Sequence, residues 1–341
     1  MEDRPIFIAG PDRSGTTLLY ALLASHPNIS MVRRMNYWRW FNERYGDLNV
    51  PENFERLLDR LLHYKRIKRL DPDGERIRNE FLQGEHSYAR LIAILLRQNA
   101  EKAGKPRWGD KSLHTEHYAD LAFSQFPQAK IIHMTRDPRD RYASVRKRFG
   151  KDSPRLAAAT GRWLNSMKAA LRNQKNYPER YLIVRYEDLA AYPEETSRKI
   201  CQFIGEVYSP EMLTMAGETE YRNSGGNSSF NKIQPGTIST RSIGRYHEVL
   251  SPYETLFIQR FSDTLMLEFN YPLDDVQLSV LQKIKYFTWF LPYHYLRMRA
   301  WKFINFILCK RKAPPPANRF LDGRTESNLT LGGSHVKPYV Q

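Results

Sequence analysis

Short apolar runs alternate with longer stretches of helical spacing along the first two hundred residues. Three runs have the continuous apolar pattern of buried strands: Ile6–Ala9, Lys130–Thr135 and Tyr181–Arg185. Helical spacing covers residues 53–65, 87–103, 116–125, 138–149 and 157–176. Buried strands that alternate with helices are typical of a parallel sheet covered on both faces. The sequence therefore predicts a three-layer α/β fold, in which helices flank a central, mostly parallel sheet.

The pattern changes in the C-terminal third. Residues 218–245 are rich in Ser, Asn, Gly and Thr and predict a long loop, and 252–269 predict a helix. Residues 278–312 carry eight Lys or Arg, nine aromatic residues and no acidic residue. Their longest uncharged apolar run, 286–296, is too short to span a bilayer. We expect a domain over 1–275, an aromatic and basic helical extension over 276–312, and a disordered tail over 313–341.

Charge narrows the possible partners. The chain of 341 residues holds 53 Lys and Arg against 37 Asp and Glu, a formal net charge of +16. Such an excess suits an anionic ligand, nucleic acid or an anionic membrane, although a merely basic protein would share it. The two cysteines exclude a disulfide framework. No signal-peptide pattern precedes the first strand, so a cytoplasmic location is expected.

The first predicted strand runs directly into a glycine loop, Gly10-Pro-Asp-Arg-Ser-Gly-Thr-Thr17, and a helix start. Free backbone N–H groups and the helix dipole make such a turn an anion site. The spacing is close to that of a P-loop, but Thr16 stands where the P-loop lysine belongs. Arg13 supplies a cation from inside the loop instead. The pattern indicates a phosphate that is held differently than in an ATPase.

A second anion site follows the strand that ends at Thr135. Arg136 comes next, Pro138 suits the first turn of a helix, and Ser144 lies about two turns further on. The arginine fork and the serine hydroxyl could clamp one phosphate. In the alternative interpretation, Arg136 forms an ion pair and Ser144 is a packing residue. Two anion sites at neighbouring strand ends suit a nucleotide that carries phosphates at two separate positions.

These residues, in this order, resemble the sulfotransferases that use 3′-phosphoadenosine 5′-phosphosulfate (PAPS). The glycine loop is similar to the family's 5′-phosphosulfate loop, and Arg136 with Ser144 resembles its 3′-phosphate motif. Val184-Arg-Tyr-Glu-Asp-Leu189 resembles the segment whose tyrosine lies near adenine. Ser242-Ile-Gly-Arg-Tyr246 is similar to a late motif that closes over the nucleotide.

The resemblance implies a role for each matching residue, with PAPS as co-substrate, 3′,5′-ADP as product and no metal. Arg136 and Ser144 would hold the 3′-phosphate, Tyr186 would lie near the base, and Arg245 would add a second cation. The 5′-phosphate and the sulfonate would lie on Arg13, Ser14, Gly15, Thr16 and Thr17.

Transfer to a hydroxyl also needs cations and a base. Arg13 and Lys111 are the expected cations, because Lys111 resembles a family lysine near the bridging oxygen. His114 is the first choice for the base, although it could equally cap a helix or lie at the surface. Many relatives carry a glutamate base about eight residues past a His-Pro pair. Here Arg34 takes that position, and an arginine cannot act as a base at neutral pH. Further candidates for the base are Glu43, Asp110 and Asp12.

The acceptor is expected to be a hydroxyl on a glycan, a glycolipid or another small molecule. Arg33, Arg34, Tyr37 and Trp38 could bind an anionic or sugar-like acceptor, although the aromatic pair could equally be core. Residues 278–312 could lie on the cytoplasmic face of an anionic membrane, or pack on the domain.

Three functions other than sulfonate transfer are also compatible with parts of the sequence. They are a P-loop kinase or NTPase, a basic nucleic-acid-binding protein, and a nucleotide-binding relative without catalysis. The missing lysine argues against the first, and the ordered motifs argue against the first two, so no nucleic acid is expected as a partner.

Overall fold

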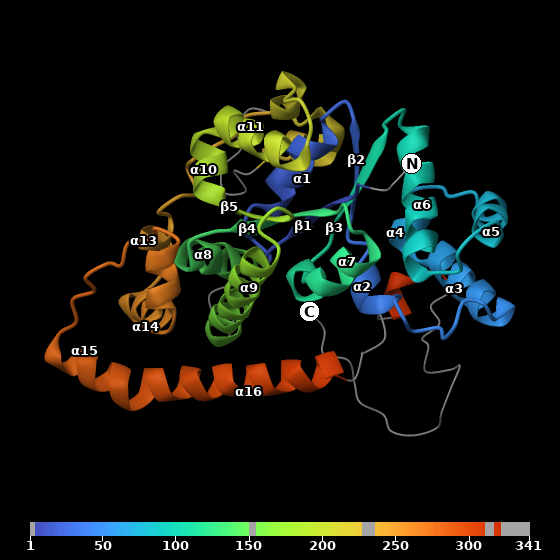
Figure 1. Ribbon diagram of the computed structural model, residues 1–341. Coiled ribbons are helices and arrows are strands. Elements are labelled where there is room, and N and C mark those ends of the chain that lie inside the picture. Colours follow the sequence, from blue (N-terminus) through green and yellow to red (C-terminus); the bar gives the residue numbers. More distant parts are fainter. Residues whose placement is uncertain (1–3, 150–154, 227–235, 311–316, 322–341) are drawn as a thin grey trace.

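A five-stranded sheet lies at the centre of the computed structural model, which describes residues 4–149, 155–226, 236–310 and 317–321 (Figure 1). The strand order is β2-β3-β1-β4-β5, and every neighbouring pair is parallel. The strands are β1 (Ile6–Ala9), β2 (Ile29–Arg33), β3 (Arg107–Lys111), β4 (Lys130–Thr135) and β5 (Tyr181–Arg185). The predicted three-layer α/β architecture is confirmed.

Helices make up most of the remaining described chain. In order, they are α1 (Thr16–Ala24), α2 (Tyr37–Trp40), α3 (Pro51–His63), α4 (Lys65–Lys68), α5 (Gly74–Leu82), α6 (Tyr88–Lys102), α7 (Ala119–Gln125), α8 (Pro138–Phe149), α9 (Leu156–Asn176), α10 (Tyr186–Ala191), α11 (Pro193–Ile204), α12 (Thr219–Asn223), α13 (Tyr246–Val249), α14 (Pro252–Glu268), α15 (Val280–Lys285) and α16 (Leu291–Lys310).

Alternating residues of the central strand point into two separate cores. Ile6 and Ile8 pack in the core beneath α1, α10 and α11, whereas Phe7 and Ala9 pack in the core formed with α6, α7 and α9. Figure 1 shows these helices on opposite faces of the sheet. Burial on both faces explains why this strand is apolar at consecutive positions rather than at every second one.

Two strands, β2 and β3, are absent from the sequence prediction. β3 carries Arg107, Asp110 and Lys111, so it lacks the continuous apolar run that marks β1. Gly109 in its middle allows close packing, because a Cβ there would meet the carbonyl oxygen of Ile6 at 2.5 Å. Polar residues in a buried strand need partners. Arg107 pairs with Glu206 at 2.8 Å, and Lys111 belongs to the candidate site.

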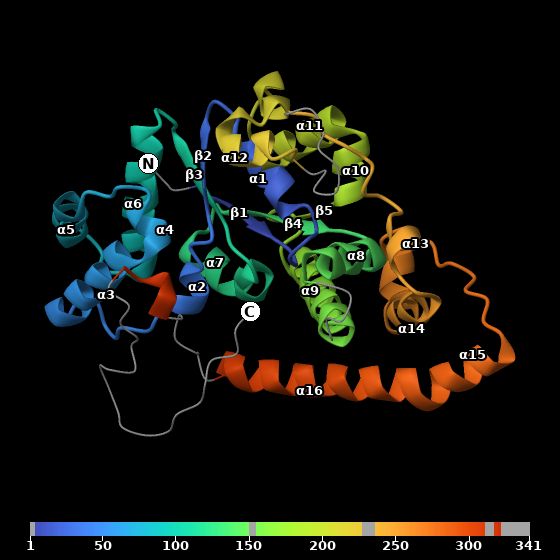
Figure 2. The same cartoon turned by 180° about the vertical axis from the view of Figure 1, so that it is seen from behind.

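The C-terminal extension is helical where the structure describes it. α15, a π-helical turn (Tyr286–Phe290) and α16 run in succession, and α16 lies along α9 (Figures 1 and 2). Beyond it, Phe320 is buried against Tyr64, and the N–H of Leu321 donates to His63 O at 3.0 Å. These contacts lie within the tail for which disorder is expected; the rest of that tail falls outside the described residues. Within the described ranges, no helix is long and apolar enough to cross a membrane.

The predicted loop over 218–245 is only partly a loop. It contains α12, and residues 227–235 lie outside the described part of the chain.

Candidate functional site

The glycine loop joins β1 to α1 in a backbone shape that only certain residues permit. Gly10 has φ 117°, and a Cβ there would meet the carbonyl oxygen of Met134 at 2.3 Å. Gly15 caps α1 with φ 84°, and Arg13 also lies in the left-handed region at φ 67°. The turn aims the first N–H groups of α1 at the carboxyl edge of the sheet, where ligands of such folds bind.

A buried hydroxyl in this loop points to a ligand. Ser14 is fully buried, and its Oγ has no hydrogen-bond partner among the described residues. Leaving such a group unsatisfied costs about 1–3 kcal/mol. Gly15 and Thr17 beside it are half-buried. The loop therefore fits an anion that would accept hydrogen bonds from this hydroxyl and the backbone.

The second predicted anion site lies directly beside the loop. Arg13 Nε donates to Ser144 Oγ at 2.8 Å, and Arg136 donates to the carbonyl of Arg13 at 3.4 Å. The Arg136 guanidinium lies 4.4 Å from the centre of the Tyr186 ring and also donates to the Ser242 carbonyl. The Tyr186 hydroxyl and Ser242 Oγ are 2.6 Å apart. Residues from four distant parts of the sequence thus meet in one cluster.

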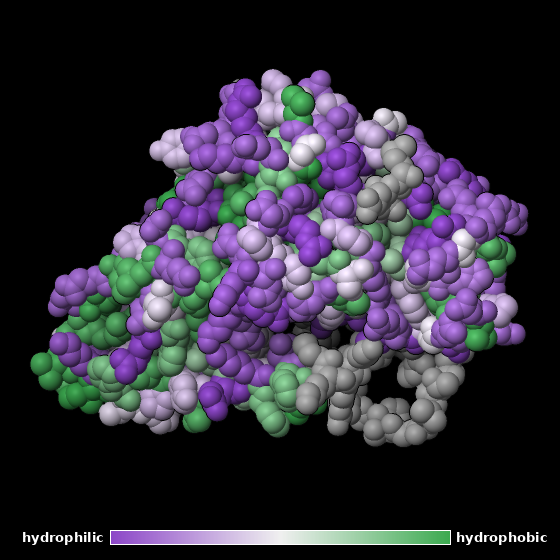
Figure 3. Space-filling model, in the orientation of Figure 1, coloured by the Kyte–Doolittle hydropathy of each residue, from purple (hydrophilic) through white to green (hydrophobic). Residues whose placement is uncertain are grey.

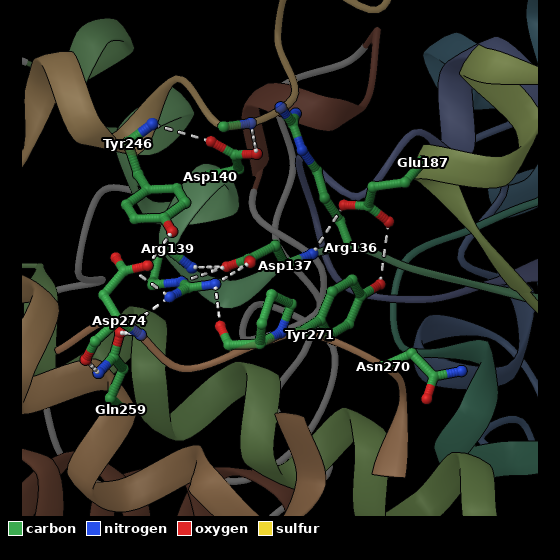
Figure 4. A network of polar contacts seen from close by, with 12 residues as sticks. Arg136, Asp137, Arg139, Asp140, Glu187, Tyr246, Gln259, Asn270, Tyr271 and Asp274 are labelled. Carbon is green, nitrogen blue, oxygen red and sulfur yellow. Dashed lines mark hydrogen bonds and ion pairs between the residues drawn. The ribbon is translucent and has the colours of Figure 1, made fainter. Parts of the chain in front are cut away.

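One carboxylate ties the late motif to the start of α8, in the network of Figure 4. Asp140 accepts hydrogen bonds from the backbone N–H of Gly244 at 2.8 Å and of Tyr246 at 2.9 Å. Half-buried Arg245 lies between these two anchors. Burial raises the pKa of Asp140, while Arg136 acts in the opposite direction. We call residues 242–246 the strap, because they are held against the Arg136 end of the site.

The other part of this network consists of ion pairs and hydrogen bonds that hold the start of α8 against neighbouring segments. Arg139 makes an ion pair with Asp137 at 2.6 Å and with Asp274 at 3.3 Å. Glu187 accepts from the N–H of Asp137 at 3.0 Å and from the Tyr271 hydroxyl at 3.0 Å. These bonds link α8 to α10 and to the segment after α14, so they orient the Arg136 turn rather than bind a ligand.

Lys111 lies at the end of β3 and faces the loop. It is 6% exposed, and its Nζ lies 3.2 Å from Thr17 Oγ1 on the first turn of α1. Burial, together with the charges of Arg34 and Arg33, lowers the pKa of Lys111 to about 8. Lys111 is therefore not a solvated loop residue, because its side chain belongs to a buried strand.

His114 lies in a different charge environment from Lys111. It has φ 70° and is half-buried, and burial lowers its pKa to about 4. Glu116, Arg39 and Arg162 are the leading charges that act on it. None of these is among the leading charges on Lys111.

Neighbouring Glu116 supports the loop. Its carboxylate accepts from the Ser166 hydroxyl at 2.7 Å and from the N–H of Gly10 at 3.3 Å. The ligand atoms of His114, Glu116 and His117 lie within 4.8 Å of one another, as a metal site would require. Because both Glu116 oxygens already hold protein groups, we assign the cluster to loop support.

Sequence reasoning missed Glu218. Its carboxylate lies 3.2 Å from the guanidinium of Arg33, and Glu220 lies 3.0 Å from the same group. Glu218 is nearly buried, acts electrostatically on Lys111 and hydrogen-bonds the hydroxyl of Tyr20 on α1. No motif marks this glutamate, since it follows Lys111 by more than a hundred residues in a segment that reads as a loop.

The proposed acceptor residues divide between surface and core. Arg34 is exposed at the end of β2, and Arg33 is half-buried. Tyr37 and Trp38, however, are 2% and 6% exposed, and Trp38 packs edge-on against Phe7 at 5.7 Å. The expectation that these two rings bind an acceptor is therefore corrected, because they fill the core beside β1.

Two further candidates for the base, Asp12 and Asp110, have surroundings that do not suit this role. Asp12 makes ion pairs with Arg141 and Arg162, which hold the pKa of its carboxyl well below its usual range against the effect of burial. Asp110 points to the opposite side of β3 from Lys111, among Met35, Trp38 and Trp108. Neither carboxylate is placed to serve a hydroxyl beside Lys111.

The chain matches the protein family described as "Sulfotransferase family" over residues 5–210. The protein belongs to this family. The match covers β1 to α11 and includes the loop, Lys111, Arg136, Ser144 and Tyr186. It favours sulfonate transfer over the kinase and nucleic-acid alternatives.

Known proteins agree with this membership. A protein-tyrosine sulfotransferase of Drosophila melanogaster is 26% identical over 61% of this chain and 39% of its own length. This chain thus spans well under two thirds of that relative. The sulfotransferase domain of the Synechococcus PCC 7002 olefin synthase aligns with a TM-score of 0.57 and 24% identity, over 80% of this chain and 98% of that domain. The sulfotransferase domain from the curacin biosynthetic pathway aligns with a TM-score of 0.52 and 20% identity, over 80% of this chain and 99% of that domain. These two similarities concern the fold.

Proposed function

We propose that the protein transfers the sulfonate of PAPS to a hydroxyl group and releases 3′,5′-ADP, without a metal. One observation carries the proposal. The side chain of Arg13, inside the anion loop, donates to Ser144 of the second anion site. Both sites therefore form one continuous cradle, as a nucleotide with phosphates at its 3′ and 5′ positions requires.

Each part of the cradle suits a part of PAPS. The 5′-phosphate and sulfonate would lie on the first turn of α1, where the Ser14 hydroxyl lacks a partner among the described residues. Arg136 and Ser144 would hold the 3′-phosphate, with the strap and Arg245 above them. Tyr186, beside Gly15 and under Arg136, would border the adenosine.

Bound there, PAPS supplies a sulfonate on a phosphate leaving group. The chain's own contribution is charge and position. Lys111 lies beside Thr17 on the first turn of α1. Together with the N-terminal N–H groups of α1, the Thr16 and Thr17 hydroxyls and Arg13, it would stabilise the negative charge that develops during transfer. Side-chain cations thereby supply what magnesium supplies in P-loop NTPases.

The proton of the acceptor hydroxyl needs a base, and Glu218 suits this role better than His114. Glu218 shares the neighbourhood of Lys111 and Arg33, whereas the leading charges around His114 belong to other groups. Arg34 follows directly after Arg33, at the position where many relatives carry a glutamate. The carboxylate of Glu218, from a distant segment, would thus replace the glutamate that many relatives carry at the position of Arg34.

For the acceptor we propose a glycan or a glycolipid, used at the cytoplasmic face of a membrane. Exposed Arg34 adds positive charge next to Lys111, whereas the charge of Arg33 is balanced by Glu218 and Glu220. The charge of Arg34 favours an acceptor that carries negative charge or many hydroxyls. A tyrosine peptide is the natural comparison, because the Drosophila relative is named a protein-tyrosine sulfotransferase.

Calorimetric titration with 3′,5′-ADP tests the nucleotide site. Binding should be unaffected by magnesium and should weaken about 100-fold in Arg136→Ala, since two charge-assisted hydrogen bonds are lost. Arg198→Ala is the matched control, because this arginine is exposed on α11, where it pairs with Glu194 and lies over the Tyr208 ring. A preference for ATP with magnesium would contradict the proposal.

Transfer itself is tested with PAPS carrying labelled sulfur. We expect label in glycan or glycolipid fractions and little in a tyrosine peptide. Label in the peptide alone would keep the sulfotransferase assignment and overturn the acceptor. Tight binding of 3′,5′-ADP without transfer to any fraction would leave a nucleotide-binding protein that lacks catalysis.

A further inference from the structure

The C-terminal helix has two apolar faces, and only one of them is covered by the described protein. On the inner face, Tyr286 and Met298 are buried, and Trp301 packs over Gly161 of α9. Phe290 lies 5.4 Å from the ring of Tyr253, in the first turn of α14. These contacts hold the π-helical turn and α16 against α14 and α9 (Figure 2).

The outer face carries large apolar side chains that reach solvent. Trp289 is 80% exposed, and Leu296 and Phe303 are each 65% exposed. These three follow one another at intervals of seven residues, which places them along one side of a helix. Val280 and Leu281 extend the apolar surface at 75% and 71% exposed. Figure 3 shows apolar residues gathered over this part of the molecule.

Exposed apolar side chains in such a row mark an interaction surface rather than ordinary scatter. The charge around them indicates the partner. No acidic residue occurs between 278 and 312, and exposed Lys283, Lys285, Arg297 and Arg299 flank the apolar row. A surface that combines Trp, Leu and Phe with Lys and Arg alone suits the headgroup region of an anionic bilayer.

A second copy of the chain is a poorer partner. Two such helices face to face would bring their basic residues together without a counter-charge in either one. An anionic lipid surface instead attracts each nearby Lys or Arg by about 1 kcal/mol. Because no described helix is long and apolar enough to cross a bilayer, contact along its side is the mode that remains for this helix.

The helix is also linked to the anion loop. Trp301 lies 6.0 Å from the guanidinium of Arg162 on α9, and Arg162 pairs with Asp12 of the loop at 3.0 Å. Only two side chains therefore separate α16 from the nucleotide cradle. A membrane under α16 would lie close to the transfer site, as a lipid-borne acceptor would need.

We propose that the outer face of α15 and α16, centred on Trp289, Leu296 and Phe303, binds the surface of anionic membranes. Membrane binding by this surface does not depend on the transfer reaction, so it can be tested without catalysis. It deepens the proposed function by giving a glycolipid acceptor a place from which to approach.

Flotation of the full chain with lipid vesicles tests the proposal. The protein should float with vesicles of phosphatidylcholine and phosphatidylglycerol at low salt, and binding should fall at least tenfold with phosphatidylcholine alone. Half a molar salt should weaken it, because screening shortens the reach of charge. Brominated lipid should quench the fluorescence of Trp289 in the wild type, and Trp289→Phe should lose most of that quenching while still floating.

A triple variant, Trp289→Ser with Leu296→Ser and Phe303→Ser, should lose at least tenfold in binding. The matched control is Leu82→Ser with Val207→Ser, which removes exposed apolar side chains from other parts of the surface and should bind normally. Titration with 3′,5′-ADP should give the same affinity in all variants, which shows that the fold and nucleotide site survive.

Two outcomes would overturn the proposal. One is equal vesicle binding by the triple variant and the wild type. The other is a dimer in solution that dissociates in the triple variant while vesicles bind neither form; the outer face would then be a contact between two copies. A failure of sulfonate transfer would leave the vesicle result intact, so the two proposals fail separately.

Discussion

Asp110 and Lys111 are adjacent on β3, yet strand geometry sends their side chains to opposite faces of the sheet. Lys111 points to the anion loop, where burial lowers its pKa to about 8. Asp110 points into the aromatic core, where burial raises its pKa to about 7. Each therefore titrates near neutral pH, but with different consequences.

For Lys111 the consequence concerns nucleotide binding. An anion prefers the protonated amine, so affinity for 3′,5′-ADP should be constant below pH 8 and fall up to about tenfold per pH unit above it. Lys111→Arg keeps its charge and should remove this fall. Titration calorimetry from pH 6.5 to 9.5 measures both curves. Parallel curves for the two proteins would show that Lys111 does not contact the bound nucleotide.

For Asp110 the consequence concerns stability. Its pKa is raised in the folded state, so the native protein binds more protons than the unfolded chain between about pH 4 and pH 7. Stability should therefore decrease as pH rises through this window, by at most about 4 kcal/mol for this group. Asp110→Asn, which can still accept from Ser112, should flatten the dependence in urea unfolding. An unchanged pH profile would contradict the buried position.

Substitutions of Glu218 and His114 should have opposite effects on the rate of transfer. Glu218→Gln should lower kcat by about 100-fold or more while leaving the affinity for 3′,5′-ADP within a factor of two, because loss of a general base affects the chemical step. His114→Gln should change kcat little. Single-turnover transfer measures both, and the reverse pattern would assign the base to His114.

At the scale of elements, the strap is the part that joins distant segments. Asp140 on α8 holds it by two backbone N–H groups, and Arg136 holds the carbonyl of Ser242. The strap comes about a hundred residues after α8, so its position depends on these bonds. A ligand under it would also be enclosed by it.

Asp140→Ala should therefore loosen the strap. We expect affinity for 3′,5′-ADP to fall about tenfold, as two hydrogen bonds to a carboxylate are lost. Hydrogen exchange at Gly244 and Tyr246 should become faster in the variant, whereas exchange in β1 should not change. Asp263→Ala, on the exposed side of α14, is the control. Unaltered exchange in the strap would show that other contacts hold it.

Strands differ in how far the sequence predicts them. β1, β4 and the first turns that follow them were predictable, because burial on both faces requires consecutive apolar residues. β2 and β3 were not, because Ser30 and Arg33 in one, and Arg107, Asp110 and Lys111 in the other, interrupt that pattern. Ser30, Arg33, Arg107 and Lys111 find their partners on other elements, which no local pattern reveals.

At the scale of the whole molecule, Gly161 of α9 is one of the positions at which α16 packs on the domain. A Cβ at Gly161 would meet the Trp301 ring at 2.9 Å and Met298 Cγ at 3.4 Å. Gly161→Val should push α16 outward and speed hydrogen exchange over residues 291–307, while nucleotide affinity changes little. Gly161→Ala serves as the milder comparison. Slow exchange in both variants would mean that contacts elsewhere suffice to hold the helix.

The sequence by itself determined the fold class and predicted the two anion sites of the proposed nucleotide cradle. Buried parallel strands need apolar runs, and an anion loop needs glycines, a helix start and a cation in close order, so both leave local patterns. Only the tertiary structure decided that Tyr37 and Trp38 are core, that Glu218 lies beside Arg33 and Lys111, and that α16 keeps an apolar face in solvent. The physical reason is distance along the chain. Burial and charge pairing depend on which segments meet in space, and residues that contribute one side chain each from far apart carry no local pattern.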